Sequence, residues 1–160
     1  MAVRSATSET LLALDNDVFT DWRKHRPPVT ALIEDYRTHN DRPPKLTAMT
    51  VFQARFGFDK QIAKLGALDE QFENLRLEME QAIKDCGVLE INDQVTAIAS
   101  HIFARLSASE RNRHWADVFV AATALAHGYG LATRNRADFE LIGQRLPSFT
   151  PDLFLAIWKS

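Results

Sequence analysis

The chain has few of the residues that stabilise secreted proteins or anchor proteins in membranes. Cys86 is its single cysteine, which excludes an internal disulfide and fits a reducing cytosol. Its apolar runs are far shorter than the ~20 residues that a membrane-spanning helix needs. The opening stretch MAVRSATSETLLAL also has no apolar region of the kind found in signal peptides. We therefore predict a cytoplasmic protein with no membrane partner.

An excess of charge of either sign is also missing. The 19 Lys and Arg residues against 21 Asp and Glu give a net charge of −2, which excludes binding of nucleic acid mainly through overall charge. There is no internal repeat, low-complexity tract or Gly/Ser linker that would indicate a second domain. With 160 residues, the chain is predicted to form a single domain over residues 1–160.

Several common catalytic signatures are absent. The chain contains no P-loop, no Gly-rich dinucleotide fingerprint and no Gly-x-Ser-x-Gly motif. One cysteine cannot build a structural zinc site. The sequence also shows no close pairing among the five histidines: His25, His39, His101, His114 and His127.

Short apolar segments alternate with helical patterns along the chain. This alternation predicts βαβ crossovers, and hence an α/β fold with a mainly parallel, twisted sheet flanked by helices on both faces. The predicted strands are 11–14, 45–49, 87–93 and 129–133. Predicted helices lie between the two proline pairs at 27–28 and 43–44, over 50–57 with Gly57 as the stop, around Val95 to Leu106, and over 117–128 between Asp117 and Gly128.

The middle region, 58–113, is predicted to be largely helical. Between Phe58 and Gly87, apolar residues recur at intervals of three and four, which gives one continuous apolar stripe. Packing of a helix or helical hairpin on its own domain is favoured over a coiled-coil partner surface. The C-terminal tail, 148–160, is predicted to open a helix at Thr150–Pro151 and to pack on its own domain rather than on a partner.

Acidic residues stand near the ends of the first and last predicted strands. Asp15 and Asp17 follow the first predicted strand, Asp138 follows the last, and Asp117 begins the helix leading into the last strand. Each has a simpler role on its own: Asp117 as a helix N-cap, Asp15 and Asp17 in a turn, and Asp138 in a loop. Together they favour a crevice at the carboxyl ends of the strands, where clustered carboxylates would bind Mg²⁺ or Mn²⁺.

These residues also carry a family resemblance. The stretch LLALDNDVF resembles the first acidic motif of PIN domains, and LTAMTVFQARFG resembles the second. The stretch ADVFVAATALAHGYGLATRNRADF closely resembles the third and fourth motifs in the VapC toxin branch of bacterial toxin–antitoxin pairs. Region 58–113 matches only in length and helicity. The resemblance implies a Mg²⁺- or Mn²⁺-dependent ribonuclease acting on RNA, a homodimer, and an antitoxin protein that blocks the crevice.

The resemblance also assigns roles to individual residues. It places the first, third and fourth acids, as catalytic metal ligands, on Asp15, Asp117 and Asp138. Thr133 and Asn135 match the polar residues that precede the fourth acid and would orient ligands or water. Asp17 stands where the family commonly has Asn, as a brace for the loop. For RNA contact, Arg134 and Arg136 are favoured among three basic clusters, the others being Arg23-Lys24-His25-Arg26 and Arg111-Arg113-His114.

Gln53 departs from the family pattern, which has Glu at this position. A neutral amide is a weaker metal ligand, so cleavage would be weakened. An alternative is local, with the Gln53 amide reaching back to the Thr50 backbone in a capping box. Gln53 also supports a second function, a catalytically impaired module of PIN type that binds RNA or protein.

A phosphatase of the haloacid dehalogenase type is a further alternative for the opening motif. Asp15 would be its nucleophile and Asp17 its general acid. That chemistry also needs a strand-end Ser or Thr, then a Lys and an acidic pair. After Thr133, the sole lysine is Lys159 near the terminus, and no acidic pair follows. The order of residues therefore disfavours this alternative.

Overall fold

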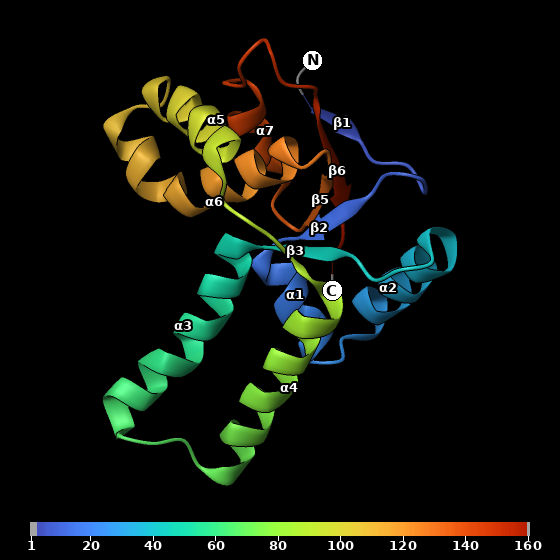
Figure 1. Ribbon diagram of the computed structural model, residues 1–160, viewed down its shortest axis with the longest axis vertical. Coiled ribbons are helices and arrows are strands. Elements are labelled where there is room, and N and C mark those ends of the chain that lie inside the picture. The colour runs from blue at the N-terminus through green and yellow to red at the C-terminus, as the bar shows by residue number, and fades with distance from the viewer. Residues whose placement is uncertain (1–2, 160) are drawn as a thin grey trace.

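The computed structural model describes residues 3–159, so residues 1, 2 and 160 of the predicted domain lie outside the described part. In that part the chain forms strands and helices in alternation (Figure 1). The strands are β1 (Val3–Ser5), β2 (Leu12–Leu14), β3 (Lys45–Thr47), β4 (Val88–Leu89), β5 (Gly130–Thr133) and β6 (Leu153–Ile157). The helices are α1 (Asn16–Arg23), α2 (Pro27–Asn40), α3 (Ala48–Leu65), α4 (Glu70–Cys86), α5 (Asp93–Ala104), α6 (Ala108–Ala126) and α7 (Arg136–Gly143).

The strands form one sheet in the order β1-β6-β5-β2-β3-β4, and each neighbouring pair is parallel. Successive side chains of a strand point to opposite faces of a sheet. Accordingly, Leu12 and Leu14 enter one hydrophobic core, shared with α1 to α4, whereas Ala13 enters a second, shared with α5 to α7. Figure 1 shows these two groups of helices on opposite sides of the sheet. The predicted α/β class is confirmed.

Residues 58–87 form the predicted helical hairpin rather than one helix. Gly66, with φ 83°, ends α3, and Asp69 caps the start of α4. Figure 1 shows α3 and α4 projecting side by side beyond the sheet. The apolar stripe is buried only near the sheet, at Met79 and Cys86, whereas Leu65 is 64% exposed. Packing on the chain's own domain is therefore confirmed for the end of α4 that lies next to the sheet.

Two predicted helix boundaries are wrong because earlier capping residues extend the helices. The Oγ1 atom of Thr47 accepts a hydrogen bond from the Thr50 backbone, so α3 begins at Ala48 and runs through Gly57 without stopping. Ser107 and Glu110 form a complete capping box at the start of α6. The helix predicted over 117–128 thus begins at Ala108, and Asp117 is not an N-cap.

The helix predicted in the tail is also wrong, since residues Leu153–Ile157 form β6. This strand lies between β1 and β5, with Leu155 paired to both Ser5 and Leu131. Strand β1 precedes the predicted first strand and was not expected either. Because β6 is an inner strand of the sheet, the predicted packing of the tail on its own domain is confirmed. Among residues 3–159, no helix has the length and apolar character needed to cross a membrane.

Candidate functional site

Asp15 lies at the carboxyl end of β2, where the strand gives way to α1. It is the N-cap of α1, and its Oδ1 accepts a hydrogen bond from the Asn16 backbone at 2.8 Å. Its Oδ2 accepts from Thr133 Oγ1, at the end of the neighbouring strand β5, at 2.9 Å. The side chain is 4% exposed. Both carboxylate oxygens are therefore held in place, one by the first residue of α1 and the other by the last residue of β5.

Asp117 and Asp138 reach the same edge of the sheet from two helices. Asp117 lies in the middle of α6, and Asp138 lies in the first turn of α7. Together with His114, each offers a ligand atom, and these atoms lie within 4.8 Å of one another. The fold thus brings together acids that are distant in the sequence.

The acids at this edge raise one another's pKa. The pKa of Asp15 is raised to about 6, chiefly by burial and also by the charges of Asp117 and Asp17, although the hydrogen bonds from Thr133 and Asn16 lower it. Burial and the charge of Asp138 raise the pKa of Asp117, although His114 nearby lowers it. Negative charge therefore accumulates where water cannot solvate it well, which favours the binding of a cation.

The segment after β5 is tied to α1 by polar contacts. Thr133 Oγ1 accepts a hydrogen bond from the Asn135 backbone at 3.1 Å, and Asn135 Nδ2 donates to Asp17 Oδ2 at 3.0 Å. The Arg134 guanidinium lies 3.6 Å from Asp17 and 3.2 Å from Asp21. Asp21 was not singled out from the sequence, although its spacing of four from Asp17 places both on one face of α1.

Gln53 does not complete a capping box, and the local capping interpretation is wrong. The cap of α3 is Thr47, while Thr50 Oγ1 donates to the backbone oxygen of Leu14 at 3.0 Å. This bond holds α3 against the residue that precedes Asp15. Gln53 Oε1 is buried and has no hydrogen-bond partner in the described residues. An unpaired amide oxygen therefore lies on α3, three residues after the one that contacts the end of β2.

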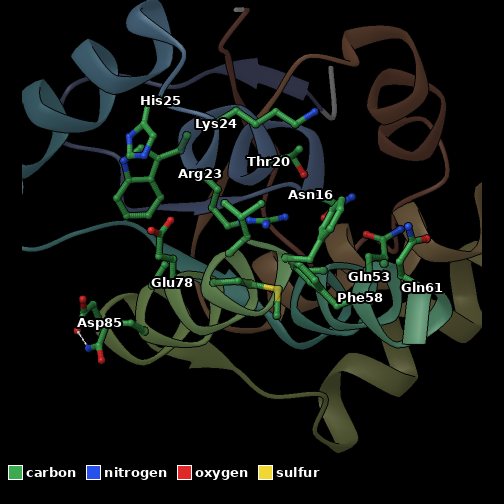
Figure 2. Close-up of a pocket in the computed structure, with 18 residues that line it drawn as sticks. Asn16, Thr20, Arg23, Lys24, His25, Gln53, Phe58, Gln61, Glu78 and Asp85 are labelled. Carbon is green, nitrogen blue, oxygen red and sulfur yellow. Dashed lines mark hydrogen bonds between the residues drawn. The ribbon is translucent and has the colours of Figure 1, made fainter. Parts of the chain in front are cut away.

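Gln53 also lines a pocket of about 820 Å³ between α1 and the α3–α4 hairpin. Figure 2 shows Asn16, Gln53 and Gln61 towards one end of the pocket and His25 and Asp85 towards the other. The walls between them include apolar side chains of α3 and α4. Asn16 lines this pocket and directly follows Asp15 in the chain. The pocket therefore lies next to the acidic cluster.

The basic residues near the acids differ in their surroundings. Arg136 is exposed and lies 3.4 Å from Glu140, while Arg111 and Arg113 are exposed on α6. His114 does not belong with them, since it is 5% exposed and lies against Asp117. The close partners of His114 are thus carboxylates, which the sequence analysis did not anticipate. The sequence did contain a signal for the contact between His114 and Asp117, because residues three apart on one helix lie on the same face.

Comparison with known proteins identifies relatives of this chain. No family model matches the chain. The VapC ribonuclease Y4jK of Sinorhizobium fredii is 31% identical over 134 residues, which cover 83% of this chain and 93% of that protein. The chain belongs to the VapC ribonuclease family. The resemblance seen in the sequence motifs is thereby confirmed.

Several solved structures share the fold. A chain of the VapBC2 crystal structure from Rickettsia felis, bound to a promoter DNA fragment, matches with a TM-score of 0.65 at 15% identity. The match covers 92% of this VapC-family chain and 98% of that one. A chain of FitAcB from Neisseria gonorrhoeae matches with a TM-score of 0.59 at 25% identity, over 90% of this chain and 95% of that one.

Proposed function

We propose that this VapC-family chain is a metal-dependent endoribonuclease of the toxin type, which hydrolyses RNA phosphodiester bonds with a metal-activated water. The observation that supports this most directly is the convergence of Asp15, Asp117 and Asp138 at the carboxyl edge of the sheet. Oxygen-rich sites with several carboxylates suit Mg²⁺ and Mn²⁺. The raised pKa values of two of these acids fit a site whose charge a cation would compensate.

Each residue of the site has a separate task in this proposal. Asp15, Asp117 and Asp138 would hold Mg²⁺ or Mn²⁺, which when bound activates water and offsets charge on the phosphate. Thr133 fixes the direction of the Asp15 carboxylate by donating to Oδ2. The contact between Asn135 and Asp17 braces the segment beside the metal position.

Arg134 and Arg136 are proposed to contact RNA phosphates. They lie on either side of Asn135, immediately after β5, and Arg134 is partly exposed beside Asp17. Guanidinium groups bind phosphate oxygens through charge-assisted hydrogen bonds. They would thus supply locally the positive charge that the chain lacks overall.

The activity is tested by incubating the purified chain with single-stranded RNA and either Mg²⁺ or Mn²⁺. We expect internal cleavage that a chelator abolishes and that Asp117→Asn reduces by at least about a hundredfold, because one carboxylate ligand is lost. Asp35→Asn, on the exposed face of α2, is the matched control and should cleave like the unchanged protein. Cleavage that persists in chelator would contradict the metal-dependent mechanism.

A second function, an impaired module that binds RNA or protein without cutting, is favoured by Gln53 alone. The amide removes one negative charge from the neighbourhood of Asp15. No cleavage by the unchanged chain, with cleavage restored by Gln53→Glu, would support this alternative. Cleavage by the unchanged chain would exclude it.

We also propose an antitoxin partner and a homodimer. Two of the matching structures, from Klebsiella pneumoniae and Mycobacterium tuberculosis, are described as belonging to toxin–antitoxin systems. An antitoxin that covers the crevice should inhibit RNA cleavage when added in equal amount. Light scattering on the purified chain, with and without the product of a neighbouring reading frame, measures both associations.

A further inference from the structure

The buried side chain of His114 has a ring nitrogen without a hydrogen-bond partner in the described residues. It is 5% exposed, and its Nδ1 has no hydrogen-bond partner in the described part of the chain. The same Nδ1 lies 3.5 Å from Asp117 Oδ2, a distance too long and a geometry too poor for a hydrogen bond. Buried polar atoms in proteins are almost always paired, so an unpaired one points to a missing partner.

The His114 ring lies close to two carboxylates rather than one. His114, Asp117 and Asp138 each present a ligand atom within 4.8 Å of the others. Two ligands of one ion with bonds of roughly 2.1 Å lie at most roughly 4.2 Å apart. Shifts of less than about 1 Å in the side chains would therefore bring all three onto one cation.

The position on α6 suits such a role. His114 and Asp117 are three residues apart, so both side chains leave the same face of the helix. A carboxylate and a histidine at this spacing form the ligand pairs of dinuclear carboxylate sites in helix bundles. The capping box of Ser107 and Glu110 starts α6, and its N-cap Ser107 lies seven residues before His114. His114 and Asp117 therefore both lie in the interior of the helix rather than at its start.

We propose that His114 Nδ1 is a direct ligand of the metal, so that the site is a mixed one of one imidazole and the carboxylates of Asp117, Asp138 and Asp15. This inference rests on the proposed function only in requiring a metal at this edge of the sheet. It adds a nitrogen ligand to an all-carboxylate set, at a site where Gln53 has removed one acid. The ligand count is thereby restored by a residue from a different helix.

A nitrogen ligand changes which metals the site prefers. Carboxylates suit Mg²⁺, whereas imidazole favours the later transition metals, whose affinities rise from Mn²⁺ to Ni²⁺. The unchanged chain should therefore bind Ni²⁺ at least about tenfold more tightly than Mn²⁺, and Mn²⁺ more tightly than Mg²⁺. The affinities are measured by calorimetry on protein without a histidine tag and without RNA.

Two variants of His114 separate coordination from packing. In His114→Asn the amide oxygen replaces Nδ1, so affinity for Mg²⁺ should stay within a few-fold while the preference for Ni²⁺ falls by about tenfold. In His114→Ala both affinities should fall. His39→Ala is the control, because His39 lies 3.6 Å from Asp35 one turn away on α2, but both are exposed. That pair is not part of a three-residue cluster, so the control should change neither affinity.

Direct coordination has a spectroscopic signature that needs no variant. Electron spin echo measurements on the Mn²⁺ complex should show nitrogen coupling, which changes when the protein is labelled with ¹⁵N-histidine and disappears in His114→Asn. Metal binding without histidine coupling, and with unchanged metal preference in His114→Asn, would overturn the assignment. Mn²⁺ coordinated by His114 in a chain that cleaves no RNA would leave this inference standing and refute the proposed activity. A chain that binds none of these metals would refute both.

Discussion

At the residue scale, the buried carboxylate of Asp15 costs the metal-free protein stability. Its pKa in the folded chain is about 6, against an ordinary 3.8. The folded state therefore holds this proton more tightly than the unfolded state does. The contribution of this carboxyl to stability is therefore most favourable below pH 4 and is lost as the pH rises through about 6, where the group loses its proton in the folded state as well.

The first prediction follows from this linkage. In chelator at pH 8, Asp15→Asn should raise the free energy of unfolding by on the order of 2 to 3 kcal/mol, because the buried charge is removed. At pH 4 the gain should vanish. Urea unfolding at both pH values measures it, with the exposed Asp35→Asn as the control. A gain of equal size at both pH values would show that charge is not the cause.

The second prediction concerns Gln53, whose buried Oε1 has no hydrogen-bond partner in residues 3–159. Gln53→Glu should bind Mg²⁺ about tenfold more tightly, because a carboxylate is a stronger ligand than an amide for a hard cation. Calorimetry measures the affinity. Gln61→Glu adds the same charge on α3 in the same pocket, two turns further along, and serves as the control. Equal gains from both variants would indicate a general charge effect rather than coordination.

The third prediction concerns phosphate contact by Arg134. In an Asp138→Asn background that prevents cleavage, Arg134→Ala should weaken RNA binding and lower the slope of log affinity against log salt by about one. Fluorescence anisotropy over a salt series measures both. Arg42→Ala is the control, because Arg42 precedes β3 and lies at the opposite edge of the sheet. Unchanged binding by Arg134→Ala across the series would refute the contact.

At the scale of elements, α6 determines whether the site forms. It carries both His114 and Asp117 and contacts α3, α5 and α7, so a shift of this helix would displace two proposed ligands together. Its start is fixed by hydrogen bonds between Ser107 and Glu110, at 3.1 and 2.8 Å. Capping boxes satisfy backbone N–H groups that a helix leaves unpaired at its start.

The fourth prediction tests this cap. Ser107→Ala should lower the free energy of unfolding by about 1 kcal/mol, because the Glu110 backbone loses its acceptor. Thermal or urea unfolding measures the loss. Ser109→Ala, two residues later in the first turn and exposed, should change stability little. If the two variants behaved alike, the cap would not be what fixes the start of α6.

At the scale of the whole molecule, the parallel sheet places the ends of β2 and β5 side by side. Leu14 pairs with Ala132, so Asp15 and Thr133 follow at the same level. Asp117 on α6 and Asp138 on α7 reach the same ends of these strands. A cation bound among these acids would link four segments of the fold.

The fifth prediction is that metal stabilises the entire chain. At a Mn²⁺ concentration a hundred times the dissociation constant, the free energy of unfolding should rise by about 2.7 kcal/mol, because only the folded state has the site. Thermal unfolding with Mn²⁺ or with chelator measures the change. In Asp138→Asn the increase should be much smaller. An equal increase in that variant would place the bound metal elsewhere.

The sequence by itself determined the class of the fold and most of its inner elements. Alternating apolar segments predicted β2, β3, β4 and β5, since period and length are local properties of the chain. Family motifs pointed to Asp15, Asp117 and Asp138 by position. The local pattern could not give β1 and β6, because β6 is held in the sheet by pairing with β5 and with β1, the latter some 150 residues away in the chain. It also placed the starts of α3 and α6 too late.

Only the tertiary structure decided what surrounds each side chain. In the sequence, His114 is one more residue in a basic cluster, whereas in the fold it is buried against Asp117 and Asp138. Gln53 is a plausible local cap in the sequence, but in the fold its amide oxygen is buried without a hydrogen-bond partner. Residue type sets which bonds a group can make, but burial and neighbours decide which of them it needs, and these depend on segments far apart in the chain.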